Sequence, residues 1–260
     1  MVIPLRDDNP TTTRPLVTMV LIAVCVVIYF GFQPKDEGGS LEFLYEYAAV
    51  PCEVTHGGPL SDVLVEECDP TRVLAGRLSD EPLFPSKQPY LSVIFSMFFH
   101  GSIMHLAGNM LFLWIFGNNI EERFGRGLFF LFYLFTGLAA AAAHILTDPN
   151  SVIPVVGASG AIAGVMGAYL VFFPHARILT IVPLFIFIQF IHLPAYVVLI
   201  AWFLLQFLTN VDSGVAVMAH IGGFVAGAGI ALVLRPFYGK PVRRPPPDLG
   251  LGGGFGNPYR

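Results

Sequence analysis

The chain alternates long apolar runs with short polar or Gly/Pro-rich breaks. Six apolar segments are predicted as helices, over residues 16–33, 99–118, 127–146, 157–173, 194–210 and 215–235. Most of them approach the length of about 20 residues that crosses a hydrocarbon core about 30 Å thick. The pattern predicts an all-α polytopic membrane protein, a bundle of six transmembrane helices with a long first extracytoplasmic loop.

Composition agrees with a membrane protein and narrows its chemistry. Of the 260 residues, 55% are hydrophobic and only 12% are charged, which is typical of a chain that spans a bilayer several times. The middle of the chain has no Lys/Arg cluster, so nucleic-acid binding is not expected. There is no His-Glu-x-x-His motif, and we expect neither a metal site nor a cofactor.

Basic residues lie beside alternate ends of the apolar segments, and this asymmetry predicts the orientation. They precede the first segment, separate the second from the third, follow the fourth and recur after the sixth: Arg6, Arg14, Arg123, Arg126, Arg177, Arg235, Lys240, Arg243, Arg244 and Arg260. The loop 34–98 instead holds eleven acids against four bases. We therefore expect cytoplasmic termini and an outward-facing first loop. A bacterial plasma (inner) membrane is the expected location, because the amino-terminal arm is short and no organellar presequence is visible.

The same pattern divides the chain into parts. Residues 1–15 are predicted to be a cytoplasmic arm, 16–236 the membrane domain and 237–260 a disordered cytoplasmic tail rich in proline and glycine. Residues 178–193 are apolar but interrupted by prolines. Counting them as a span would place the basic tail outside, so we interpret them as an interfacial or re-entrant piece.

The first loop carries two cysteines, Cys52 and Cys68. Extracytoplasmic compartments permit disulfides, so these two residues form either a bridge or two free thiols. The sequence leaves both possibilities open.

Two polar residues stand where a membrane helix should avoid them: Ser159 and His220. Such groups are costly in a bilayer unless they have partners or a function. Pro174 ends the fourth segment only 16 residues after Ala158, and a helix of that length spans about 24 Å. We therefore expect Ser159 in the first turn of a helix that begins below the outer surface, at the floor of a wet pocket.

Small residues are expected to bring these two groups together. They recur along the fourth and sixth segments as Gly160, Ala163, Gly164, Gly167, Ala168, Ala219, Gly223, Gly227 and Ala231. Faces of this kind let membrane helices approach closely, and His220 shares the face of Gly223. A serine activated by an adjacent histidine is a minimal acyl-transfer unit. His105 and Asn109, four apart on one helix face, are candidate donors to an oxyanion.

Together these residues resemble the rhomboid intramembrane serine proteases. The motifs are His105-x3-Asn109, Gly157-Ala158-Ser159-Gly160 and Ala219-His220-x-Gly222-Gly223-x3-Gly227, in that order within residues 1–236. The resemblance implies that a Ser159–His220 dyad forms an acyl-enzyme and cleaves peptide bonds in or near transmembrane segments of membrane proteins. It further implies that His105 and Asn109 act at the oxyanion site, that Gly157 shapes that site, and that substrate enters beside the fifth segment.

The chain departs from its relatives at two places. Many of them carry a Trp-Arg pair where this sequence reads Tyr90-Leu91-Ser92. Some also place an aromatic residue one turn after the serine to stack on the histidine, and this chain has Ala163 there. The orientation of the imidazole must then come from another part of the protein.

Other interpretations remain open at this point. Ser159 alone fits a helix cap, and His220 alone fits a cross-helix hydrogen bond. The chain would then be a non-catalytic rhomboid-like protein that binds transmembrane helices for quality control. A small-solute transporter is a third hypothesis, although transporters commonly contain inverted repeats and none is evident here. The oligomeric state cannot be predicted from the sequence.

Overall fold

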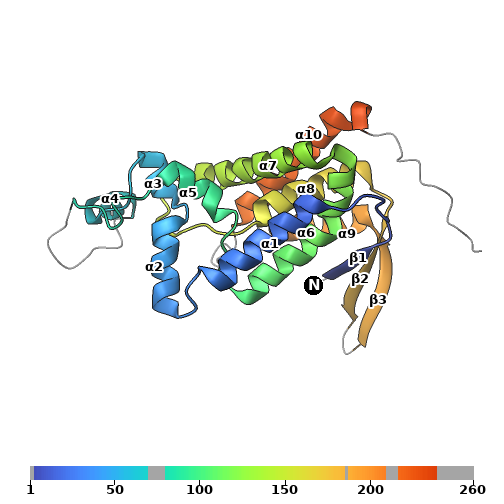
Figure 1. The fold of residues 1–260 in the computed structure, drawn as a ribbon, viewed down its shortest axis with the longest axis horizontal. Helices are drawn as coiled ribbons and strands as arrows, with labels where there is room; N and C mark the ends of the chain where they lie inside the picture. The colour runs from blue at the N-terminus through green and yellow to red at the C-terminus, as the bar shows by residue number, and fades with distance from the viewer. Residues whose placement is uncertain (1–2, 70–79, 185–186, 209–215, 239–260) are drawn as a thin grey trace, which may run out of the picture.

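A helical bundle with a small sheet at one end makes up the computed structural model, which describes residues 3–69, 80–184, 187–208 and 216–238. The helices are α1 (Leu16–Gly31), α2 (Glu37–Tyr47), α3 (Pro51–His56), α4 (Asp62–Cys68), α5 (Pro89–Ser96), α6 (Ile103–Phe124), α7 (Arg126–Thr147), α8 (Ser159–Phe172), α9 (Ala195–Gln206) and α10 (Val217–Tyr238). The strands are β1 (Ile3–Asp7), β2 (Arg177–Leu184) and β3 (Phe187–Pro194). Helices α2 to α5 and the sheet lie at opposite ends of the bundle (Figure 1).

Each of the six predicted apolar segments overlaps one helix of the bundle: α1, α6, α7, α8, α9 and α10. Among the described residues, α7 and α10 are long and apolar enough to cross a bilayer, and α1, α8 and α9 are shorter apolar helices. The length and composition of these helices fit an integral membrane protein. Six crossings remain a prediction.

Helix α6 continues to Phe124, past the end expected at residue 118, because its last turn binds the start of α1. The buried carboxylate of Glu121 accepts hydrogen bonds from the backbone N–H groups of Val17, at 3.0 Å, and Thr18, at 2.8 Å. The first N–H groups of a helix have no partner within it. The negative charge of a carboxylate at this end is also attracted by the positive end of the helix dipole. Glu121 therefore caps α1 from a neighbouring helix.

The sheet is a correction to the expected all-α fold. The stretch 178–193 is expected to be an interfacial or re-entrant piece, and its described residues lie in the antiparallel strands β2 and β3; the arm 1–15 supplies β1. The strand order is β1-β2-β3, with Ile181 opposite Ile3 on one side and Phe190 on the other. The stretch is rich in Ile and Phe, which favour strands, and an antiparallel pair of strands also returns the chain to the same side of the bundle.

Asp7, at the end of β1, fastens the amino-terminal arm to the bundle. Its carboxylate accepts hydrogen bonds from the Tyr169 hydroxyl, at 2.8 Å, and from the Asn119 amide, at 2.6 Å. Burial raises the pKa of Asp7 to about 6, although the two hydrogen bonds act in the opposite direction. The folded protein therefore holds this proton more tightly than the unfolded chain does.

This raised pKa predicts a pH-dependent stability. The folded-state pKa of Asp7, about 6, lies above the ordinary value of 3.8, so ionisation of Asp7 disfavours the folded state. The contribution of Asp7 to the free energy of unfolding therefore falls as pH rises from about 4 to 6. Asp7→Asn removes this titration. The melting temperature of the variant in detergent, minus that of the wild type, should therefore increase by several degrees as the pH rises from about 4 to 6. Asp80→Asn, at an exposed position, is the control for the general effect of replacing one carboxylate by an amide. A constant difference for Asp7→Asn would contradict the prediction.

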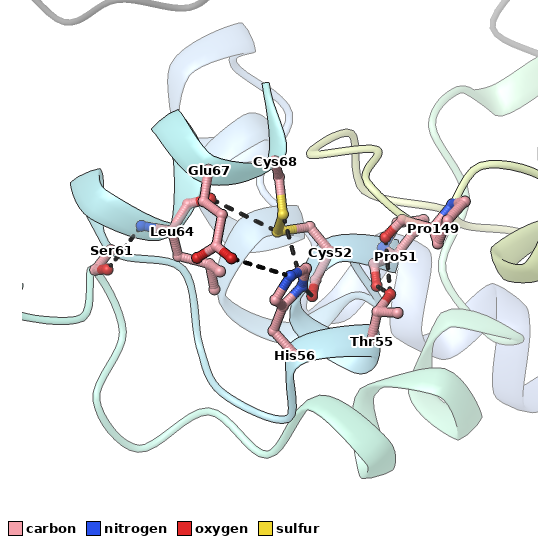
Figure 2. A network of polar contacts seen from close by, with 9 residues as sticks. All are labelled: Pro51, Cys52, Thr55, His56, Ser61, Leu64, Glu67, Cys68 and Pro149. Carbon is pink, nitrogen blue, oxygen red and sulfur yellow. Dashed lines mark hydrogen bonds and ion pairs between the residues drawn. A yellow bond between two sulfur atoms is a disulfide. The ribbon is translucent and has the colours of Figure 1, made fainter. Parts of the chain in front are cut away.

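The first loop is folded around a disulfide between Cys52 and Cys68, which decides the question that the sequence left open. Figure 2 shows this bridge joining α3 to α4, with the His56 ring beside it. The His56 Nδ1 atom lies 2.9 Å from the Cys52 carbonyl oxygen. The two short helices are thereby fixed to each other.

The same loop also contains a buried ion pair. The Lys87 ammonium lies 2.5 Å from the Glu53 carboxylate, and both side chains are 1% exposed. Burial raises the pKa of Glu53 and lowers that of Lys87, while their attraction opposes both shifts. Removing one member of such a pair leaves an uncompensated buried charge, so the pair ties α3 to the chain that enters α5.

The folded loop in turn holds the segment that leads into α8. The Thr55 hydroxyl donates to the Pro149 carbonyl at 2.7 Å, as Figure 2 shows, and the Cys52 N–H donates to the Ser151 carbonyl at 3.0 Å. Ala49 and Val155 form an isolated antiparallel bridge. The position of the α8 N-terminus is therefore set from the first loop.

Candidate active site

Ser159 is the first residue of α8, as the sequence predicts. Gly157, two residues before Ser159, has φ +129°, a backbone conformation that residues with a Cβ rarely adopt. Its N–H donates to the Ser96 carbonyl at 2.9 Å. The N-cap, Ala158, makes no side-chain hydrogen bond, and the first N–H groups of a helix lack partners within it. Ser159 therefore stands among backbone donors.

Helices α8 and α10 pack through their small residues, as expected. A Cβ at Gly223 would overlap the Gly160 carbonyl oxygen, and a Cβ at Gly227 would overlap the Gly164 carbonyl oxygen. These backbones thus touch directly at two levels. The contact fixes the distance between the first turns of α8 and α10.

His220, in the first turn of α10, reaches Ser159 across this contact. Its Nε2 atom lies 2.8 Å from the Ser159 Oγ atom, and both residues are partly exposed. A histidine nitrogen at this distance from a hydroxyl has the geometry of a general base next to its nucleophile. The structure thus brings the two predicted residues together.

Two predicted oxyanion-site residues also lie at the serine. A Cβ at Gly157 would stand 2.9 Å from the His105 imidazole and 3.4 Å from the Ser159 Oγ atom, so the His105 ring faces Gly157 beside the serine. Asn109 lies one turn further along α6 and is 8% exposed. Its amide nitrogen has no hydrogen-bond acceptor among the described residues, so it is a buried donor available to another group.

Gln206, in the last turn of α9, is a further polar residue at the site that was not predicted from the sequence. Its Oε1 atom lies 2.8 Å from the His220 Nδ1 atom, on the opposite side of the imidazole from Ser159. The Trp202 ring, one turn earlier, lies 5.7 Å from the imidazole. The sequence feature that could have identified Gln206 is an amide side chain within an apolar segment. Polar groups are costly in membranes, and this applies to Gln206 as it does to Ser159.

A possible metal-ligand set lies in the first loop. The side-chain ligand atoms of Cys52, His56 and Cys68 lie within 4.8 Å of one another. Zinc binds cysteine as the thiolate, and both sulfurs are joined in the disulfide. In this state the cluster is a covalent crosslink.

Comparison with known proteins gives a family model and several similar proteins. The family model described as "Rhomboid domain" matches residues 87–237. The chain is 34% identical over 142 residues to rhomboid protease GluP of Bacillus subtilis, and this match covers 54% of this chain and 26% of that protein. It is 31% identical over 156 residues to rhomboid protease AarA of Providencia stuartii, covering 54% and 55%. It is 32% identical over 149 residues to RHOMBOID-like protein 5 of Arabidopsis thaliana, covering 56% and 45%. In all three, the match spans little more than half of the relative's length or less.

Proposed function

The chain belongs to the rhomboid family, and we propose that it is an intramembrane serine endopeptidase. The observation that carries the proposal is the distance of 2.8 Å between Ser159 Oγ and His220 Nε2. Rhomboid proteases GluP and AarA are among the similar proteins. The proposed substrates are membrane proteins cut in or near their transmembrane segments.

The proposed reaction proceeds through an acyl-enzyme. Ser159 Oγ attacks the scissile carbonyl carbon while His220 Nε2 accepts the hydroxyl proton, and the imidazolium then protonates the leaving amine. Water, deprotonated by the same imidazole, hydrolyses the ester and regenerates Ser159. Each half of the reaction forms and breaks one bond at the carbonyl carbon. The Ser159 proton leaves with the amine, and a proton taken from water by His220 restores the hydroxyl.

The negative charge of the tetrahedral intermediate needs donors, and three groups are proposed for it. These are the His105 imidazole, the Asn109 amide and the backbone N–H of Ser159. Gly157 leaves room for the His105 ring beside the serine, because any Cβ there would press on it. Donors fixed in advance stabilise an oxyanion without reorganisation during the reaction.

The proposed orientation places the site near the outer face of a bacterial plasma membrane. The first turn of α8 is held by the first loop, whereas Arg6 and Arg177 lie in the sheet at the other end of the bundle (Figure 1). Basic residues favour the cytoplasmic side. The sheet end would then be cytoplasmic, with both termini, and Ser159 would lie toward the outer leaflet.

Cleavage of a single-span reporter in proteoliposomes tests the proposal. Wild-type protein should cut the reporter and react with a fluorophosphonate probe at Ser159, identified by mass spectrometry. Ser159→Ala should do neither, while Ser151→Ala, in the loop before α8, should do both. Binding of the reporter without cleavage or labelling would instead indicate a non-catalytic rhomboid-like helix binder.

A further inference from the structure

Gln206 connects helix α9 to the candidate base. Its Oε1 atom faces His220 Nδ1 at 2.8 Å, and its Nε2 group donates to the Trp202 carbonyl at 3.0 Å. The side chain is almost fully buried, at 8% exposure. Because the amide nitrogen is already used by Trp202, the amide cannot turn over without losing that bond. The oxygen is thereby fixed toward the imidazole.

This arrangement determines which imidazole nitrogen carries the proton. An amide oxygen only accepts hydrogen bonds, so the atom facing it must be an N–H donor. A neutral imidazole has a single N–H, and here it is at Nδ1. The lone pair is then on Nε2, the atom that lies 2.8 Å from the Ser159 hydroxyl.

We propose that Gln206 is a positioning residue that holds His220 in the Nδ1–H tautomer, so that Nε2 can accept the Ser159 proton. The inference rests on the proposed function for its catalytic consequence, but the tautomer itself is a property of the resting protein. Gln206 neither gains nor loses a proton during turnover. The Nδ1–H bond to its oxygen persists while the proton moves between Oγ and Nε2.

The chemistry of the site favours an amide in this role. A carboxylate would add a buried charge within the membrane segments, which is costly, whereas the amide supplies an acceptor without that charge. One turn after Ser159 this chain has Ala163 rather than an aromatic residue, and α9 provides both the Gln206 acceptor and the Trp202 ring at the imidazole. The orientation that the sequence could not account for thus comes from α9.

Two substitutions at Gln206 separate the effect of the acceptor oxygen from the effect of side-chain volume. Gln206→Met keeps the length and removes the acceptor, while Gln206→Glu keeps an oxygen at the same reach. For wild type, ¹⁵N-imidazole NMR of His220 should show the Nδ1–H tautomer, and Gln206→Met should show a mixture. We expect kcat of Gln206→Met to fall about 10- to 100-fold with KM unchanged, the pattern of an interaction needed only for the chemical step. Gln206→Glu should recover most of that loss.

Gln33→Met is the matched control, because Gln33 is also buried and exchanges two hydrogen bonds with the His100 backbone. It should lower the melting temperature without changing the His220 tautomer. An Nε2–H tautomer in the wild type, or a Gln206→Met variant with wild-type kcat and tautomer, would overturn the role of Gln206. Neither result would affect the Ser159 assignment. A wild type that neither cleaves nor binds the serine probe would instead overturn the proposed protease, with the tautomer still measurable.

Discussion

His220→Ala is expected to lower kcat at least about a thousandfold, the scale seen when a serine hydrolase loses its base. Without the imidazole, the Ser159 hydroxyl has no acceptor for its proton, since the Nε2 atom at 2.8 Å is removed. The small-residue contact between α8 and α10 does not involve this side chain. The variant should therefore fold and bind the reporter normally, and initial rates in proteoliposomes measure the loss.

A double variant tests whether the two residues act as one unit. Groups that act together are strongly non-additive, so Ser159→Ala with His220→Ala should be no slower than either single change. His175→Ala, at an exposed position, is the matched control and should retain wild-type turnover. Additive losses from Ser159 and His220 would show that the two side chains work independently, which would contradict the dyad.

The bundle helices could be predicted because bilayer length and apolar composition constrain them together. The prediction for the fourth segment was the sharpest, since Pro174 and the Gly157 motif bracket a helix that runs from Ser159 to Phe172. The sheet was missed because residues 178–193 are as apolar as a span. Their pairing with β1 depends on chain far away in the sequence, and no local pattern encodes it.

The candidate site was predictable to a similar extent. Ser159 and His220 were predicted to lie together because small residues on two helices define a common face, and the contact between Gly160 and Gly223 brings those two faces together. Gln206 was not found, because its significance depends on how α9 is rotated against α10. That rotation is set by packing between the helices rather than by any motif, and the Trp202 carbonyl only orients the amide within α9.

Gly227→Ala is expected to lower kcat about 100-fold or more, although residue 227 lies far from the reacting atoms. A Cβ there would overlap backbone atoms of Gly164, and backbone cannot move aside as a flexible side chain can. Helix α10 must therefore shift away from α8 and carry His220 with it. A displacement of about 1 Å can cost a factor of about 100 in rate, and overpacking of this kind costs about 1–3 kcal/mol of stability.

Gly229→Ala provides the matched control on the same helix. Among the described residues, no atom beyond the adjoining turns of α10 lies within 4 Å of a Cβ at that position, and alanine favours helix over glycine by about 1 kcal/mol. This variant should keep wild-type turnover and melt at the same or a higher temperature. If Gly227→Ala also kept full activity, α10 could move without disturbing the dyad, and the direct contact of the two backbones would not be what sets the distance between serine and histidine. Loss of both activity and probe labelling in Gly227→Ala alone would connect the small-residue face to the chemistry at Ser159.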